Sequence, residues 1–368
     1  MESITKRRHD IDWLRVIAIG LLLIYHIAII FQPWGVLIGF VQSSEPMESL
    51  WIPMGMLNVW RIPLLFFVSG MGVCFAIKKR SWKQLIGERA KRILIPFLFG
   101  IACIVPLHIL IWQSYYNQDL SYYPNPAHLW FLGNIFSYVL LLSPLFFYLV
   151  KREDSIIDRW LKEMYKHPLG LIPLMLVFIL EVMLVRPEPY ELYAMTWHGF
   201  FLGLIAFFFG FTFILYGNSF WPTVLKWRWL FLGMGLALYV TRFVYFEFEA
   251  PGYLTSIESN MWIFAVFGFG YKYLNRSNKA LSYLSQAAYP IYIIHMAFLY
   301  LGGYFILPLS VGVFLKFILI VVFTFAGCFI TYELIIRRVN FLRPLFGLKL
   351  KNKVNKKAVQ INQEVSAA

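Results

Sequence analysis

Ten stretches of the chain are each apolar over a length sufficient to cross a lipid bilayer. They lie at about 14–32, 53–77, 93–112, 128–150, 169–185, 198–216, 229–246, 260–274, 287–306 and 311–336. About 20 apolar residues in an α-helix span the hydrocarbon core, where unpaired backbone groups are too costly to leave exposed. We therefore predict an all-α, polytopic integral membrane helical bundle of about ten transmembrane helices. The composition agrees, because 60% of the residues are hydrophobic and only 14% are charged.

The distribution of charge predicts how the bundle is oriented. Most of the 33 lysines and arginines lie before the first span, after the last, or in alternate connections between them. The other connections, the outer loops to which we assign Glu258, are mainly acidic. Basic connections remain on the cytoplasmic side of a membrane, so both termini are predicted to be cytoplasmic. The net charge of +14 therefore reflects topology, and no nucleic-acid partner is expected. We divide the chain into a cytoplasmic N-terminus (1–12), a transmembrane domain (13–345) and a basic, flexible cytoplasmic tail (346–368).

The first span carries the most informative pair of side chains. Arg15 and His26 are eleven residues apart, which on an α-helix is about 20° past three full turns, so they share one face about 16 Å apart. A neutral imidazole inside a membrane is suited to general-base catalysis, although a structural hydrogen bond to a neighbouring helix explains it as well. Arg15, with Asp12 one turn before it, is suited to bind a phosphate or to anchor the helix at the membrane surface.

Further candidates fall on both sides of the membrane. Arg89 and Arg92 are neighbours on one helix face at the cytoplasmic side, where they suit a nucleotide ligand or ordinary topology signalling. Arg61 is too deep in the second span for its charge to reach water easily, so it should face a polar cavity or a carboxylate. On the outer side, His128 and Trp130 follow a tyrosine-rich segment that suits either a sugar-binding mouth or an interfacial aromatic belt.

Two remaining features have structural interpretations. Ser69 and Gly70 favour close helix packing. For His295 in the ninth span a structural hydrogen bond is expected. The three cysteines lie in apolar spans, so no disulfide framework is implied. No spacing typical of metal ligands or phosphate loops is present, and we expect neither a metal site nor a bound cofactor.

The series of motifs resembles the integral-membrane acyltransferase-3 family over about residues 10–345. The resemblance rests on Asp12-Trp13-Leu14-Arg15 followed by His26, and on five further motifs in order. These are PLLFFVSG at 63–70, Arg89 and Arg92 before Pro96, HLWFL at 128–132, YPIYIIH at 289–295, and Glu333 in TYELIIRR. WRIPLLFFVSG and RRVNFLRPLFG are most similar to the glucan-modifying branch, the glucan biosynthesis protein C type. The hydrolase-like outer domain fused to some relatives is absent from this sequence.

The resemblance implies an O-acyltransferase of the bacterial cytoplasmic membrane. Acyl-CoA, as donor substrate, would bind at Arg15, Arg89 and Arg92, and His26 would act with Arg15 and Asp12 in catalysis. An extracytoplasmic carbohydrate would enter near His128, Trp130 and Arg61, while Ser69, His295 and Glu333 would support the site. An extracytoplasmic partner protein is a further implied possibility. The alternative that the residues leave open is a polytopic transporter of a glycan or lipid precursor, whose buried charges would line a translocation path.

Overall fold

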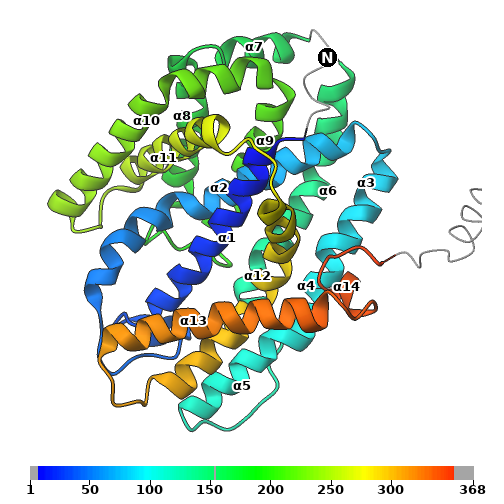
Figure 1. Ribbon diagram of the computed structural model, residues 1–368. Coiled ribbons are helices and arrows are strands. Elements are labelled where there is room, and N and C mark those ends of the chain that lie inside the picture. The colour runs from blue at the N-terminus through cyan, green and yellow to red at the C-terminus, as the bar shows by residue number, and fades with distance from the viewer. Residues whose placement is uncertain (1–6, 153–154, 352–368) are drawn as a thin grey trace, which may run out of the picture.

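The computed structural model describes residues 7–152 and 155–351, and this part of the chain consists of helices and connecting loops (Figure 1). The helices are α1 (His9–Ile29), η2 (Gly35–Ile38), η3 (Glu48–Leu50), α2 (Trp51–Ile77), α3 (Trp82–Arg89), η4 (Ala90–Leu94), α4 (Ile95–Phe99), η5 (Gly100–Ile104), α5 (Val105–Tyr115), η6 (Ala127–Leu129), α6 (Trp130–Lys151), α7 (Ile156–Met164), η7 (Pro168–Leu171), α8 (Ile172–Val185), α9 (Trp197–Leu215), α10 (Gly217–Phe246), α11 (Gly252–Tyr273), α12 (Lys279–Ile306), α13 (Val313–Thr331), η8 (Tyr332–Ile336) and α14 (Leu342–Leu345).

Nine helical stretches of the described chain are long and apolar enough to cross a membrane. This confirms the predicted polytopic helical bundle. The expected span at 260–274 is not among the nine and corresponds to α11, which begins earlier, at Gly252. The first half of α11 carries buried polar side chains, including Thr255, Glu258 and Asn260, which lowers its apolar character. Glu258 therefore lies inside a helix of the bundle, and our expectation that it belongs to an outer loop was wrong.

Helix α2 forms the centre of the bundle and is buried along most of its length. It packs closely on α9 through two reciprocal glycine contacts. A Cβ on Gly70 would lie 2.0 Å from the carbonyl oxygen of Phe207, and a Cβ on Gly210 would lie 2.0 Å from that of Phe67. Small residues allow two backbones in a membrane to approach this closely, so the packing expected at Gly70 is confirmed.

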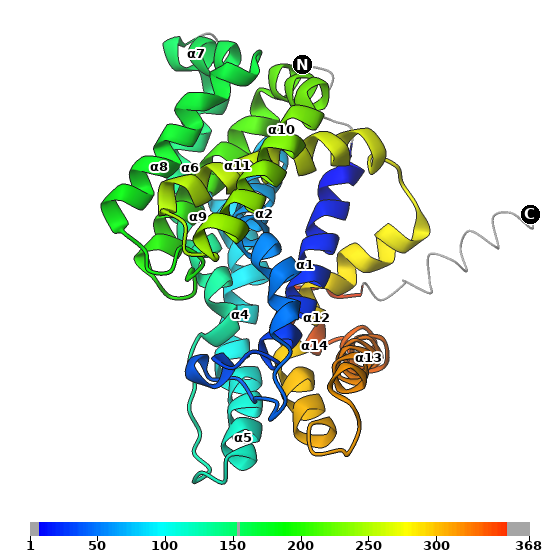
Figure 2. The ribbon, with the colours of Figure 1, turned by 90° about the vertical axis from the view of Figure 1, so that its left-hand side faces the viewer.

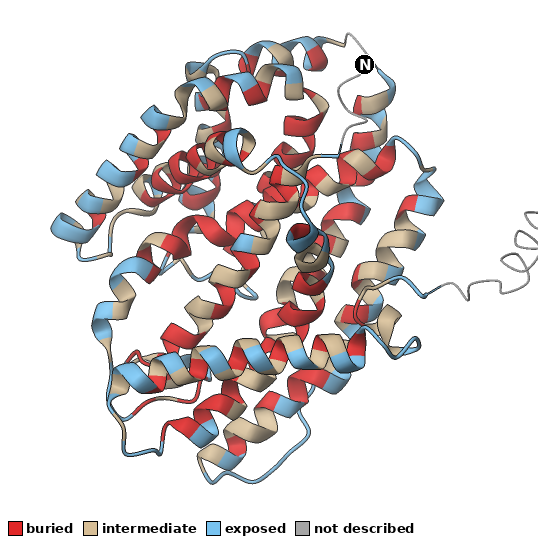
Figure 3. Cartoon of the chain, viewed as in Figure 1, coloured by how far each residue is buried: buried red, intermediate tan, exposed pale blue. Residues whose placement is uncertain are grey.

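The helices at the edge of the bundle expose apolar side chains. Leu184 on α8, Val244 on α10, and Phe314 and Val322 on α13 are all largely exposed, and Figure 3 shows the pale blue stripes of α10 and α13. Exposed apolar rows on helices of this length are expected when the solvent is lipid. The burial pattern therefore agrees with membrane insertion.

One long helical stretch, residues 82–115, changes its hydrogen-bonding register twice. Segments η4 and η5 are π-helical turns, and Pro96 and Pro106 follow them within the same stretch. Proline removes a backbone donor, and π turns are a common way for a helix to accommodate such an interruption. The first π turn immediately follows Arg89 and contains Arg92.

Helix α1 lies between α2 and α12 (Figure 2), and its face with Arg15 and His26 lines a cavity within the bundle. Arg7 and Arg15 from the start of the chain, and Arg343 and Lys349 from its end, line the same cavity. We call the end of the bundle where these residues lie the basic end, and the end that carries the loops 116–126 and 186–196 the far end. The predicted flexible tail lies outside the described residues from 352 onward. Its first part packs back on the bundle, because Phe346 is buried against Phe99.

Candidate functional site

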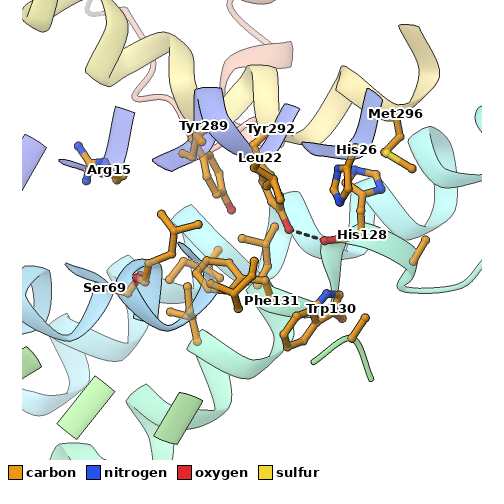
Figure 4. A pocket seen from close by; sticks show the side chains of 18 of the residues that line it. Arg15, Leu22, His26, Ser69, His128, Trp130, Phe131, Tyr289, Tyr292 and Met296 are labelled. Atoms are coloured by element: carbon orange, nitrogen blue, oxygen red, sulfur yellow. Dashed lines mark hydrogen bonds between the residues drawn. The ribbon is translucent and has the colours of Figure 1, made fainter. Parts of the chain in front are cut away.

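A cavity of about 1120 Å³ extends through the helix bundle from the basic end to the far end. Helices α1, α2, α6 and α12 supply much of its wall. In Figure 4, Arg15 and His26 lie at opposite sides of the view, with Leu22 between them. The predicted placement of Arg15 and His26 on one face of the first helix is therefore confirmed, since both line the cavity.

The basic end of the cavity is lined by six cationic side chains: Arg7, Arg15, Arg89, Arg92, Arg343 and Lys349. Several are held in place by neighbours. Arg15 Nη2 donates to Asp12 Oδ1 at 2.9 Å, Arg89 Nη2 donates to the carbonyl oxygen of Gly72 at 2.9 Å, and Arg92 Nε pairs with Glu88 Oε1 at 3.3 Å. Because the cationic side chains outnumber their acidic partners, this end is suited to bind a multiply charged anion.

The C-terminal contribution to this cluster was missed by the sequence analysis. Arg343 donates to the carbonyl oxygens of Lys349 and Arg337, at 2.7 and 2.8 Å, which fixes the segment after α14 beside the cavity. Gly347, with φ of +72°, permits the turn and lies against Tyr289 and the backbone of Arg92. Basic residues after the last span also signal topology, so their sequence pattern alone does not distinguish a ligand-binding role.

The middle of the cavity is mostly apolar. Leu22, Leu65, Val68 and Ile135 line it between the charged end and the histidines. Tyr289 adds a buried hydroxyl that has no hydrogen-bond partner among the described residues. This section is therefore suited to an extended, mainly apolar group with an occasional polar atom.

His26 is hydrogen-bonded to His295, and the geometry defines the proton positions of the neutral pair. His295 Nδ1 lies 2.6 Å from the carbonyl oxygen of Tyr292, which can only accept, so Nδ1 carries the hydrogen. His295 Nε2 is then an acceptor, and His26 Nδ1, 2.9 Å away, donates to it. The remaining nitrogen of His26, Nε2, keeps its lone pair. His26 is partly exposed and lines the cavity, so this lone pair is available to a substrate.

Two more histidines complete a cluster of four: His26, His108, His128 and His295. The ring centroid of His128 lies 5.0 Å from that of His295 and 5.6 Å from that of His108. His128 Nε2 donates to the carbonyl oxygen of Ile293 at 3.1 Å, and the Tyr292 hydroxyl donates to the carbonyl oxygen of His128, as the dashed line in Figure 4 shows. Within residues 7–152 and 155–351, no group of three or more His, Cys, Asp or Glu is arranged to hold a metal ion.

Toward the far end, the cavity becomes polar and aromatic. Asn58, Arg61, Trp130, Glu191 and Tyr193 line this part. Burial raises the pKa of Glu191 above its ordinary value, while Arg242, whose Nη1 lies 3.2 Å from Glu191 Oε1, opposes that shift. The sequence placed His128 beside Trp130 at an outer mouth. In the structure both side chains line the cavity, and the His128 ring packs within the histidine cluster.

Three predicted site residues are not near His26. Asp12 lies fourteen residues before it on α1, about 21 Å along the axis, and binds Arg7 and Arg15 at the basic end. Ser69 lines the cavity, but its hydroxyl donates to the carbonyl oxygen of Leu65 at 2.7 Å. Glu333 does not line the cavity; it pairs with Arg337 at 2.8 Å and accepts from Tyr283 at 3.3 Å. The expected hydrogen bond of His295 is confirmed, and its partner is His26.

One buried ion-pair network and one buried carboxylate–histidine hydrogen bond were not paired by sequence reasoning. Arg242 on α10 binds Glu258 on α11 through Nε at 2.6 Å and Glu191 through Nη1 at 3.2 Å. Glu181 on α8 accepts from His198 Nδ1 on α9 at 3.0 Å. Pairing of buried charges in this way is what a membrane interior requires.

Comparison with protein-family models gives one match, to a family described as "Acyltransferase domain", over residues 8–333. The matched region contains α1 to α13 and nearly all of the cavity wall. No curated protein and no solved structure matches the chain.

Proposed function

Because the chain belongs to this acyltransferase family and is therefore an acyltransferase, we propose that it is a membrane O-acyltransferase that uses acyl-CoA as donor and a carbohydrate hydroxyl as acceptor. The observation that carries the proposal is one continuous cavity that joins a cation-lined end to the free lone pair of His26 Nε2. This arrangement supplies an anion site, an apolar channel and a base in the order that such a reaction needs.

The donor would bind with its nucleotide phosphates among Arg15, Arg89, Arg92 and Arg343. Guanidinium groups bind phosphates in bidentate, charge-assisted hydrogen bonds. The pantetheine arm would then follow the apolar middle of the cavity toward His26, about 16 Å from Arg15 along the axis of α1. The Tyr289 hydroxyl, which has no partner in the part of the chain that the structure describes, is available to a polar atom of that arm.

The acceptor would approach from the far end, where aromatic and polar side chains line the cavity. Trp130 and Tyr123 offer aromatic faces to a sugar ring, and Asn125 and Asn58 offer amide groups to its hydroxyls. The resemblance to the glucan biosynthesis protein C type favours a glucan as this acceptor. With the basic end on the cytoplasmic side, the acceptor would lie outside the bacterial cytoplasmic membrane, where a partner protein could present it.

His26 would act as the general base of the transfer. The acceptor hydroxyl gives its proton to His26 Nε2 as its oxygen attacks the thioester carbon, and the carbon–sulfur bond then breaks. The proton held on His26 passes to the departing thiolate, so free CoA and an ester are the products. His295 accepts a hydrogen bond from His26 Nδ1 throughout and stabilises the imidazolium. Positioned proton transfer of this kind contributes about 10²- to 10⁴-fold.

The continuity of the cavity also favours one alternative, an exporter that moves a glycan or lipid precursor between the two ends. The experiment that separates the two uses purified protein in nanodiscs, supplied with acyl-labelled acyl-CoA and a glucan oligosaccharide. Acyl transfer predicts that label enters the oligosaccharide as free CoA appears. Replacing His26 with Gln should abolish both, while the control His167→Gln, at an exposed position on a surface turn, should leave them unchanged.

Two results would overturn the proposal. Full activity in a normally expressed His26→Gln protein would remove His26 as the base. Movement of an unmodified oligosaccharide across proteoliposomes, without release of CoA, would assign the cavity to transport.

A further inference from the structure

Arg61 is a buried cation for which the described residues supply no anion. Its side chain is 1% exposed, deep within α2, and its Nε and Nη1 atoms have no hydrogen-bond partner in that part of the chain. Its guanidinium carbon lies over the ring of Tyr25, 4.0 Å from the centroid. A cation–π contact recovers only part of what a buried charge loses when it leaves water.

Arg242 shows how the fold treats a comparable residue. It is 2% exposed, also lies toward the far end, and donates to both oxygens of Glu258, to Glu191 and to the carbonyl oxygen of Gly55. All three of its guanidinium nitrogens therefore have partners. Glu191, which lines the same cavity as Arg61, is bound to Arg242.

The position of Arg61 places it close to the proposed chemistry. Arg61 lines the cavity, and the Tyr25 ring beneath it lies 5.8 Å from the His26 ring, centroid to centroid. Asn58, one turn earlier on α2, also lines the cavity and is buried. An anion bound at the free edge of Arg61 would therefore lie beside His26, in a section of the cavity that reaches the far end.

From this geometry we infer that Arg61 is the binding site for an anionic group of the substrate, a carboxylate or a phosphate held next to His26. The inference rests on the proposed function for the role of His26. Two sources carry such a group: the free end of a dicarboxylic acyl chain, or an anionic substituent on the acceptor. In either case the anion would bind the Arg61 guanidinium through charge-assisted hydrogen bonds, and it would fix the reacting group relative to His26 Nε2.

The test compares matched substrates that differ in one anionic group. Succinyl-CoA and butyryl-CoA form the donor pair, since they have equal chain length and only the former carries a terminal carboxylate. A neutral glucan oligosaccharide and the same oligosaccharide bearing a phosphate form the acceptor pair. Binding of each compound alone to the nanodisc protein is measured by calorimetry, and transfer is measured for each combination.

The inference predicts that the wild-type protein prefers the anionic member of one pair by about 10- to 100-fold, as a charge-assisted hydrogen bond allows. A preference within the donor pair assigns the anion to the acyl group, and one within the acceptor pair assigns it to the acceptor. Arg61→Met should abolish that preference. Arg61→Lys keeps the positive charge but loses the bidentate pair of N–H donors, and it should retain part of the preference. Arg159→Met, at an exposed position on α7, is the control.

Absence of an anionic preference in both pairs of the wild-type protein would overturn the inference, even if neither Arg61 variant folds. A preference that persists undiminished in Arg61→Met would do the same. A preference in binding without any transfer would support Arg61 as an anion site and refute the proposed acyl transfer, so the two failures are distinguishable.

Discussion

His26 Nδ1 and His295 Nε2 lie 2.9 Å apart and join the first helix of the chain to one of its last. His295 is itself held by the carbonyl oxygen of Tyr292, one turn earlier on α12. The two bonds run in series, so the proton position on His26 depends on a backbone carbonyl of a different helix. This relationship gives His295 a testable positioning role.

Replacing His295 with Phe should lower kcat and leave KM for the donor nearly unchanged. His26 would lose its acceptor and its defined tautomer, at a cost of up to the 10²- to 10⁴-fold that general-base catalysis supplies. His295→Gln should recover part of the rate, because its amide oxygen can accept from Nδ1. Steady-state kinetics check this. Equal losses in the Phe and Gln variants would contradict the positioning role.

The basic end should control donor affinity. Arg92→Ala should raise KM for acyl-CoA about tenfold and change kcat little, since it removes one charge-assisted phosphate contact far from the reacting carbon. Arg276→Ala, an exposed charge outside the cavity wall, is the control. If the phosphates bind here, a donor lacking the 3′-phosphate should be less sensitive to Arg92→Ala. An identical effect on both donors would place that phosphate elsewhere.

The reciprocal glycine contacts of α2 and α9 should be intolerant of added volume. A methyl group at Gly70 meets the carbonyl oxygen of Phe207 at 2.0 Å, so Gly70→Ala should destabilise the protein by about 1–3 kcal/mol. Thermal unfolding in nanodiscs measures the change. Gly233→Ala on α10 is the matched control, because nothing lies within 4 Å of its Cβ position. Equal melting temperatures for the two variants would show that α2 and α9 can move apart at Gly70 without loss of stability.

Glu258 should be more important for folding than for catalysis. Glu258→Gln leaves Arg242 buried with only part of the negative charge that neutralises it. Removing one partner of a buried ion pair costs about 3–5 kcal/mol of stability. We expect a low yield of folded protein and a lowered melting temperature. Glu249→Gln, at an exposed position in the loop after α10, should not alter either value. A stable Glu258→Gln protein that has lost activity would instead move this pair into the functional site.

The sequence predicted those parts of the site that depend on one helix at a time. The shared face of Arg15 and His26 follows from helical geometry and needs no knowledge of neighbours. The apolar spans and the close packing at Gly70 likewise follow from local composition. Arg61 was expected to face a polar cavity or a carboxylate, and it lines the cavity.

The parts that require two helices in contact were not predictable. The partner of His295 lies 269 residues away in the chain, and no periodicity records that α1 and α12 are adjacent. Glu258 was assigned to a loop because hydropathy treats buried polar residues as exposed ones, whereas α11 faces other helices. Arg343 reaches the cavity only because the chain turns back after η8. In the sequence it is indistinguishable from the other basic residues that follow the last span and signal topology.

The apolar middle of the cavity also has a consequence for proton leakage through the protein. A passage joining both faces of an energised membrane would conduct protons if it held an unbroken file of water, and each unit charge gains about 2.3 kcal/mol per 100 mV in crossing. Leu22, Leu65 and Val68 line the cavity between the arginines and the histidines. An apolar section of this kind is unfavourable for water and forces ions to lose their hydration, so it opposes ion conduction. The side chains that would accommodate the proposed acyl donor would therefore also oppose proton leakage between the two ends of the bundle.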